Sequence, residues 1–254
     1  MRILLGLAVS FAFCAAALAD PPQQAIDAGY KNLVFSDDFN TLDMSPDGGG
    51  THRWYNGLWQ RGPVNPARFS VQDGVVRLTT DVDPRAIIMT TAITTMPRKQ
   101  PGTATTFRYG YFEARMRYNP GPFAWPAFWL LSADRPAIND KAGRGHWCEI
   151  DIFEGGRPTH YQGTVHDWRD FKSISNANQH FLLPPTADLR QWNTYGALWT
   201  PSKITWFFNG IALGSAPTPR ICQQQQLFLI LGAQKRKFGP QPESLDVDWV
   251  HAYR

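Results

Sequence analysis

Turn residues divide the chain into many short apolar segments, and this division restricts it to an all-β fold. Each segment has the length of a β-strand and is rich in β-branched or aromatic residues. Proline, glycine, asparagine or aspartate separates almost all of them, and no stretch keeps a helical period beyond about two turns. After a polar lead-in over 20–29, the segments expected to form strands are Leu33–Phe39, Ala67–Val71, Val75–Thr80, Ile87–Thr94, Phe107–Tyr118, Ala127–Leu131, Trp147–Glu154, Gly163–Trp168, Thr194–Trp199, Ile204–Phe208, Leu227–Gln234 and Leu245–Tyr253.

Local patterns show how these strands connect and pack. Asn209-Gly210, between two apolar runs, is the strongest hairpin signal, because both central positions of such a turn take positive φ. Within Phe107–Tyr118 apolar and charged residues alternate, so one face enters a core and the other meets solvent or ligand. Leu227–Leu231 is apolar on both faces, as in a strand covered on each side. The mixture predicts two stacked sheets.

The N-terminus has the pattern of a secretory signal peptide over residues 1–19. Arg2 precedes the apolar run Ile3–Leu18, and Ala17-Leu18-Ala19 supplies small residues for cleavage before Asp20. We therefore expect a secreted protein, extracellular or periplasmic, without a membrane segment after cleavage. Residues 20–254 have the length of one large all-β domain.

The net charge limits the kind of partner that is expected. The formal net charge is +4, and the densest basic run, Lys235–Lys237, predicts a solvated loop, so nucleic acid is not expected as a partner.

Cys148 and Cys222 remain after cleavage, and two cysteines in an oxidising compartment can pair. Nothing in the sequence fixes their separation, so the bridged and free forms both stay open.

Three acids in one apolar strand form the most informative segment. Glu149, Asp151 and Glu154 lie within Trp147–Glu154, where charge directed into a core would be costly. Strict alternation places Glu149 and Asp151 on one face and Glu154 on the other. A single bulge at Ile152-Phe153 would return Glu154 to the first face, and bulges are frequent beside active sites.

The expected spacing of the two glutamates favours glycosidic bond cleavage with retention. Four effective strand steps of about 3.3 Å separate the backbones by roughly 13 Å, and inward side chains leave a gap of about 5 Å. Retaining glycosidases hold their carboxyl groups about 5–5.5 Å apart, and inverting enzymes about 6.5–9.5 Å. Carboxyl groups this close cannot all ionise freely, so one serves as acid while another attacks. The alternative is three solvated acids on an exposed edge strand.

Several ordered segments make the chain similar to glycoside hydrolase family 16. Residues 149–154 resemble the E-x-D-x-x-E signature of that family, in the bulged form of its laminarinase-like members. The resemblance extends over nearly the whole mature chain. Its other segments are Phe35–Phe39, Arg108–Arg115, Trp125–Leu131, Gly163–Trp168 and Val247–Val250.

The resemblance implies a β-jelly-roll sandwich of two antiparallel sheets with an open concave cleft. By motif position, Glu149 is the nucleophile, Glu154 is the general acid/base, and Asp151 holds and tunes the nucleophile. No organic cofactor is required. Family members often carry a structural calcium, and the matching positions here are Asp38, Gly74 and Asp248, although Asp38 stands where Glu is usual.

Aromatic rings are expected to form the sugar subsites, since their faces offer apolar stacking area. Trp147 shares parity with Glu149 and should face the cleft. For each candidate, packing in the core is the alternative. The further candidates are Trp125, Trp129, His166 and Trp168 by motif position, and Arg115 on the polar face of its strand.

The substrate expected from the resemblance is a polysaccharide, β-1,3- or mixed β-1,3/1,4-glucan ahead of agar- or carrageenan-type galactans. No cluster of basic residues that would suit a sulfated galactan is evident. Transglycosylation at the same site and a non-catalytic glucan-binding sandwich are the rival functions. The protein is expected to be a monomer.

Overall fold

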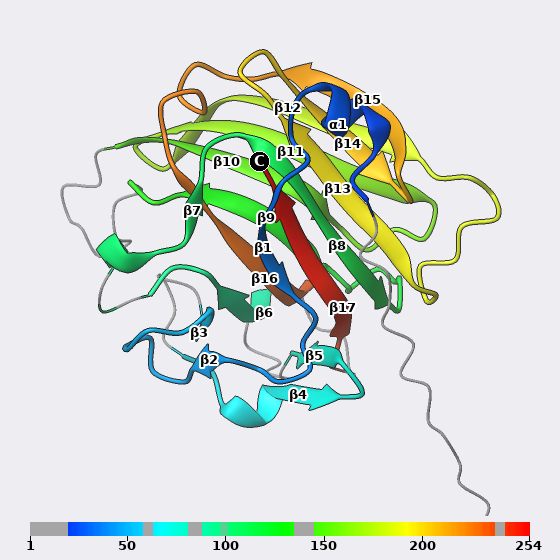
Figure 1. The fold of residues 1–254 in the computed structure, drawn as a ribbon. Coiled ribbons are helices and arrows are strands. Elements are labelled where there is room, and N and C mark those ends of the chain that lie inside the picture. The colour runs from blue at the N-terminus through cyan, green and yellow to red at the C-terminus, as the bar shows by residue number, and fades with distance from the viewer. Residues whose placement is uncertain are drawn as a thin grey trace, which may run out of the picture.

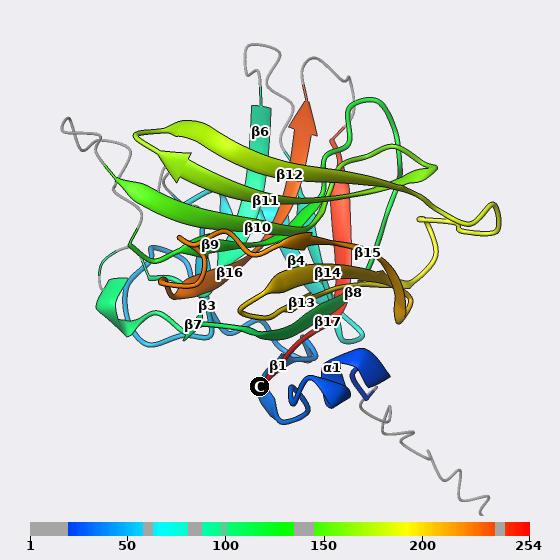
Figure 2. The ribbon, with the colours of Figure 1, turned by 90° about the horizontal axis from the view of Figure 1, so that it is seen from above.

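A computed structural model describes residues 20–57, 63–80, 88–97, 99, 101–134, 145–236 and 242–254. Within these residues two sheets stack into the predicted sandwich (Figures 1 and 2). The elements are α1 Gln23–Asp27, β1 Leu33–Asp37, β2 Met44–Ser45, β3 Trp54–Asn56, η1 Pro66–Arg68, β4 Phe69–Gln72, β5 Val75–Thr79, β6 Ile88–Thr94, η2 Pro101–Thr103, β7 Thr106–Phe107, β8 Gly110–Tyr118, β9 Ala127–Ser132, β10 His146–Glu154, β11 His160–Arg169, β12 Lys172–Leu182, β13 Asn193–Trp199, β14 Lys203–Phe208, β15 Ile211–Pro217, β16 Leu227–Arg236 and β17 Ser244–Tyr253.

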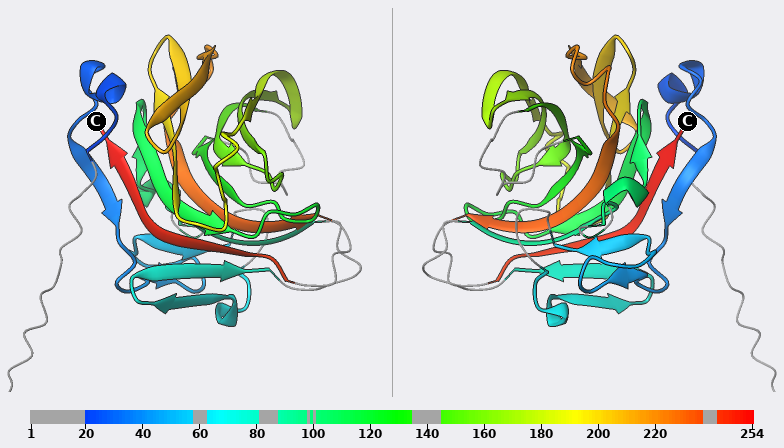
Figure 3. Two further views of the ribbon diagram at one scale, coloured as in Figure 1. Left: turned by 90° about the vertical axis from the view of Figure 1, so that its right-hand side faces the viewer. Right: turned by 90° about the vertical axis from the view of Figure 1, so that its left-hand side faces the viewer.

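The two sheets have different strand sets. In the described residues one is eight-stranded, with the order β15-β14-β13-β8-β17-β5-β4 and β1 paired to β17. The other is nine-stranded, with the order β12-β11-β10-β9-β16-β6-β3-β2 and β7 paired to β16. Neighbours are antiparallel except β2 and β3, which pair in parallel. Figure 3 shows the strong bend of β16 and β17, the long strands that curve through the sandwich.

One apolar core joins the two sheets. It contains Phe112 and Met116 of the eight-stranded sheet together with Phe128, Ile150 and Leu229 of the nine-stranded sheet. Each such side chain contributes about 1.5–3 kcal/mol when it leaves water. A smaller apolar cluster lies on the other face of the nine-stranded sheet, the face that matters for the site below.

Two expectations about local structure are corrected. The polar lead-in contains the short helix α1, which begins after Pro22 and buries Ala25. The expected strand over residues 107–118 breaks at Tyr109, which has φ 65°, and resumes at Gly110. A side chain at Gly110 would approach the carbonyl oxygen of Tyr253 to 2.6 Å, so only glycine fits there.

Two predicted segments, the signal peptide and the basic run, differ in how far the structure describes them. The predicted signal peptide, residues 1–19, and Lys237 lie outside the described residues. Lys235 and Arg236 belong to β16, and Lys235 is only 3% exposed, so the solvated loop expected there is wrong at Lys235. None of the helices in the described part of the chain is long and apolar enough to cross a membrane.

Candidate functional site

The strand with the three acids, β10, lies in the interior of the nine-stranded sheet between β9 and β11. Ile150, Ile152 and Phe153 belong to the main core. Glu149 and Glu154 are half-buried, and Asp151 is buried. This arrangement excludes the alternative of three solvated acids on an exposed edge strand.

β10 contains the predicted bulge. On β9, Asp151 lies opposite Trp129, and Glu154 lies opposite Ala127. Trp129 and Ala127 are two residues apart and share one face of their strand, whereas Asp151 and Glu154 are three residues apart. Ile152 is therefore the extra residue, and Glu154 projects from the same face as Asp151. We call this face, which also carries Glu149, the carboxylate face.

Two core side chains donate hydrogen bonds to backbone carbonyl groups at the bulge. Trp206 comes from the opposite sheet and donates its indole Nε1–H to the carbonyl of Asp151 at 2.9 Å. The hydroxyl of Tyr161 donates to the carbonyl of Ile152 at 2.5 Å. A Cβ at Gly163 would lie 2.3 Å from the Trp206 nitrogen, so this glycine makes room for the indole. The bulge is thus fixed by buried hydrogen bonds, each of which would be costly to leave unmade.

Asp151 is the buried acid of the carboxylate face. Its side chain is buried, and Oδ2 lies 3.4 Å from Nε2 of His166 on β11. His166 lies opposite Glu149 in the register, and the three groups have ligand atoms within 4.8 Å of one another. Burial raises the pKa of Asp151 to about 7. A neutral Asp151 does not repel a negative charge on Glu149.

We predict that Asp151→Asn removes a pH-dependent loss of stability. The pKa of about 7 in the folded protein lies above the pKa of about 3.9 for Asp in an unfolded chain. The folded state therefore binds the proton more tightly, and the wild-type free energy of unfolding falls as pH rises from about 4 to about 7. Urea unfolding at pH 4.5 and 7.5 should show the variant gaining stability over wild type by on the order of a few kcal/mol between the two.

The control for this experiment is Asp73→Asn, because Asp73 is exposed in a turn with φ 51°, a conformation that asparagine also tolerates. Its difference from wild type should be the same at both pH values. An equally constant difference for Asp151→Asn would contradict the assigned burial effect.

Glu154 has a neighbour that the sequence did not indicate. The side-chain amide of Gln162 on β11 lies opposite it and donates to Oε2 at 3.4 Å. The strand predicted over 163–168 begins three residues too late, and β11 in fact starts at His160. Alternation traced back from His166 would have placed Gln162 on the carboxylate face.

β12 supplies further polar groups that the sequence did not reveal. It forms the edge of the nine-stranded sheet beside β11 and has no apolar alternation that would mark a strand. By register it places Asn176, Asn178 and His180 opposite His166, Thr164 and Gln162 respectively. These side chains extend the carboxylate face with hydrogen-bonding groups.

Trp147 lies on the carboxylate face, as predicted, but it does not offer an open ring. Its side chain is 2% exposed. Half-buried Trp168 stacks on it with centroids 6.2 Å apart and planes 13° apart, and Phe171 contacts it edge-on at 5.0 Å. His166 lies against Trp168 at 5.1 Å. Trp147 therefore supports a layer in which Trp168 and His166 are closer to solvent.

The other aromatic candidates lie on the β9 side of the site. Trp129 is buried opposite Asp151 and belongs to the apolar cluster of this face. Trp125 is half-buried in the segment before β9, where its backbone N–H donates to Gln234 at 2.9 Å. A substrate contact remains a prediction for both.

Arg115 is expected to contact the sugar, but its strand does not belong to the sheet of the acids. It lies on β8 of the eight-stranded sheet, whereas the acids lie on the other sheet. Its guanidinium pairs with Asp248 and lies 5.2 Å from the ring of Trp192. Alternation identifies the polar face of a strand correctly but does not say which sheet that strand joins.

The structure gives the neighbours of the three residues expected to bind calcium. Gly74 lies beside the backbone carbonyl of Asp38, at 3.5 Å from the position of an added Cβ. The carboxylate of Asp38 lies 3.5 Å from Nε2 of His251. Asp248, however, pairs with the guanidinium of Arg115, so it could bind a cation only by giving up that ion pair. Calcium binding at Asp38, Gly74 and Asp248 stays a prediction.

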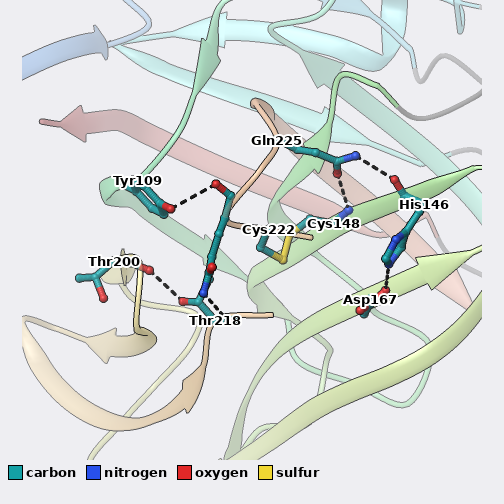
Figure 4. Close-up of a disulfide and its surroundings, with 9 residues drawn as sticks. Tyr109, His146, Cys148, Asp167, Thr200, Thr218, Cys222 and Gln225 are labelled. Carbon is teal, nitrogen blue, oxygen red and sulfur yellow. Dashed lines mark hydrogen bonds and ion pairs between the residues drawn. A yellow bond between two sulfur atoms is a disulfide. The ribbon is translucent and has the colours of Figure 1, made fainter. Parts of the chain in front are cut away.

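A disulfide anchors the start of β10 (Figure 4). Cys148, directly before Glu149, is bonded to Cys222 with their Cα atoms 4.9 Å apart. Gln225 accepts from the N–H of Cys148 at 2.9 Å and donates to the carbonyl of His146 at 2.8 Å. The bridged form, one of two left open by the sequence, is therefore the one observed.

We predict that replacing both cysteines with serine lowers the free energy of unfolding by about 2–4 kcal/mol, because the bridge restricts the unfolded chain. The two residues are 74 apart in the sequence, which makes the closed loop a long one. Urea unfolding with and without reductant measures the effect. Reductant should destabilise wild type and leave the double variant unchanged; an unchanged wild-type midpoint would contradict the prediction.

Comparisons with known proteins agree with this geometry. The family model described as glycosyl hydrolases family 16 matches residues 58–224. The Rhizobium meliloti (strain 1021) protein named endo-1,3-1,4-beta-glycanase EglC is 30% identical over 263 residues, which cover 90% of this chain and 53% of that relative. This chain thus spans about half of the relative's length.

Two solved structures show the same fold. The laminarinase from Rhodothermus marinus has a TM-score of 0.65 at 22% identity, covering 88% of this chain and 97% of its own. The GlcNAcα1-4Gal-releasing endo-β-galactosidase from Clostridium perfringens has a TM-score of 0.66 at 18% identity, covering 89% of this chain and 63% of its own.

Proposed function

Because this chain belongs to glycosyl hydrolase family 16, we propose that it is an endo-acting, retaining hydrolase of a β-glucan. The bulge in β10 carries the proposal, since it brings Glu154 to the face of Glu149 and Asp151. Two carboxyl groups on one face can flank a single anomeric carbon, which is what double displacement requires. We assign the nucleophile to Glu149 and the general acid/base to Glu154.

The reaction consists of two displacements at C1 of the sugar. In the first, a carboxylate oxygen of Glu149 forms a bond to C1 while the glycosidic C1–O bond breaks, and Glu154 gives its proton to the leaving oxygen. In the second, Glu154 takes a proton from water as the water oxygen bonds to C1. In the same displacement the ester bond between C1 and Glu149 breaks, and the carboxylate of Glu149 is regenerated. Each displacement inverts C1, so the product retains the β configuration.

The described neighbours suit these two roles. Asp151, with its raised pKa, holds a proton beside Glu149 below about pH 7 and so leaves the nucleophile as the main negative charge of the pair. Gln162 donates a hydrogen bond to Glu154 and orients its carboxyl group. Trp168, His166 and the polar groups of β12 extend along the same face, where sugar units could stack and hydrogen-bond.

We propose β-1,3- or mixed β-1,3/1,4-glucan as the substrate. A relative that aligns with 90% of this chain is named an endo-1,3-1,4-beta-glycanase. A second relative, 26% identical over 176 residues and covering 58% of this chain, is named a kappa-carrageenase, which keeps galactans as the second candidate. Incubation with laminarin, lichenan, agarose, carrageenan and xyloglucan, followed by sizing of the products, separates them. Short oligosaccharides from laminarin or lichenan support the proposal, and products from galactans alone would overturn the glucan assignment.

We also propose that the protein is secreted after cleavage before Asp20. The pattern of residues 1–19 supports this, as does a disulfide, which persists in oxidising compartments. N-terminal sequencing of the protein from the culture medium or periplasm should begin at Asp20. A mature chain that still carries residues 1–19 would contradict the assignment.

A further inference from the structure

A row of polar side chains crosses the outer face of the eight-stranded sheet, away from the carboxylate face. The register places Ser70 of β4 opposite Arg77 of β5, Arg77 opposite Asp246 of β17, and Asp246 opposite Arg117 of β8. Directly opposed residues share a face, so these four lie in one line across four strands. Trp192, just before β13, lies at the end of the line, with Arg117 4.5 Å from its ring centroid.

Ion pairs hold this row in place. Asp246 is only 5% exposed. It accepts from Nε and Nη2 of Arg77 at 2.5 and 2.8 Å and from Nε of Arg117 at 3.0 Å. Burial alone would raise the pKa of Asp246, but its hydrogen bonds to the two guanidinium groups outweigh this and lower it. Asp246 is therefore charged at neutral pH and fixes both arginines. Each guanidinium has further N–H groups that do not donate to Asp246.

The row borders a hollow of about 350 Å³. Its lining combines one aromatic residue, Trp192, with hydrogen-bonding side chains from strands that meet at this face. The complete lining is Ser70, Gln72, Asp73, Val75, Arg77, Arg117, Trp192 and Asp246. Trp192 is half-buried, and Ser70, Gln72 and Asp73 are exposed.

The charges of the lining select the kind of ligand. Arg77 and Arg117 carry two positive charges, and Asp246 and Asp73 carry two negative charges, so the hollow has no net charge. An anion gains little there. A neutral ligand that presents an apolar ring face and several hydroxyl groups could use the aromatic residue, the guanidinium donors and the carboxylate and amide acceptors together.

We propose that this hollow is a second, non-catalytic saccharide site that binds neutral sugar units of a polysaccharide. The proposal rests on the proposed function only in taking its ligand to be the same β-glucan. Because the site and the carboxylate face belong to different sheets, one protein can hold a glucan chain at the outer face while it cleaves another segment or another chain. Polysaccharide should then be retained better than a short oligosaccharide, which is too small to engage both faces.

The test compares Trp192→Ala with wild type. In a Glu149→Ala background, which prevents cleavage, affinity electrophoresis in gels containing laminarin or lichenan should show about two- to ten-fold weaker binding, the loss expected for one aromatic contact. In the active protein, KM for the polysaccharide should rise while kcat/KM for a short glucan oligosaccharide stays unchanged. Trp192→Phe keeps a ring and should bind nearly as wild type does.

Two further variants separate binding from folding. Ser70→Tyr fills the hollow from an exposed position on edge strand β4 and should weaken polysaccharide binding while the melting temperature stays within a few degrees of wild type. Ile211→Ala, an exposed apolar residue elsewhere on the same sheet, should change neither. If the enzyme cleaves glucan normally and neither Trp192→Ala nor Ser70→Tyr alters retention, the second site is wrong and the proposed function stands. If no polysaccharide is cleaved but both variants lose retention, the proposed function is wrong and the second site stands.

Discussion

Replacing Glu149 with alanine should lower kcat by at least about 10⁴-fold, comparable with removing the nucleophile of another covalent-catalysis enzyme. The variant cannot form the glycosyl ester, and water bound in its place is a far weaker nucleophile. Glu149 is half-buried on the carboxylate face, whereas the residues beside it, Cys148 and Ile150, fill the core. The core should therefore survive the change, and glucan binding should be largely kept.

Release of reducing ends from glucan measures this loss, and the near-ultraviolet circular dichroism of the aromatic core reports folding. Glu113→Gln is not a suitable control, because Glu113 is buried and accepts from Tyr111. Asp167→Asn is a better one, because Asp167 neighbours His166 on β11 but pairs with His146 instead of contributing to the acids. The assignment is wrong if Glu149→Ala keeps activity within tenfold of wild type.

Glu154→Ala should lower kcat by about 10²–10⁴-fold on a polysaccharide, because its role is proton transfer. On a substrate with an activated leaving group the first step needs no acid, so the variant should accumulate the glycosyl-enzyme. Azide added to this variant should attack the intermediate, restore turnover and yield a β-configured glycosyl azide. An α-configured azide would mean that Glu154 is not the acid/base of a double displacement.

The same azide experiment with Glu149→Ala distinguishes the two roles. Here azide would replace the missing nucleophile in a single displacement, and the product should be α-configured. If Glu154→Ala gave the α-configured azide and Glu149→Ala the β-configured one, Glu154 would be the nucleophile and Glu149 the acid/base of the same site. Gln162→Ala is a milder companion, because it removes the hydrogen bond to Glu154 and keeps the carboxyl group.

The sequence could predict the bulge because three acids in one apolar strand leave few alternatives. Burying Glu154 in the core would cost several kcal/mol, and one extra residue avoids that cost. What the sequence could not predict is how the bulge is held. Trp206 is 55 residues from Asp151 and belongs to the other sheet, so only the folded arrangement brings its indole to that carbonyl.

The errors have equally physical causes. The sequence does not predict the edge strand β12, because an edge strand can be polar and the residues of β12 lack apolar alternation. Alternation makes Arg115 a candidate sugar contact because it lies on the polar face of its strand, but alternation does not say which sheet that strand joins. Alternation predicts the correct face for Trp147, but its burial under Trp168 and Phe171 depends on the return of β11 along β10.

The central claim is that the bulge in β10 lets Glu149 and Glu154 act on one sugar carbon from opposite sides. The most direct test is proton NMR of a fresh reaction with a glucan oligosaccharide, recorded before the new reducing ends mutarotate. We predict that the β-anomer appears first and the α-anomer only later. Release of the α-anomer first would show a single displacement and would contradict the account.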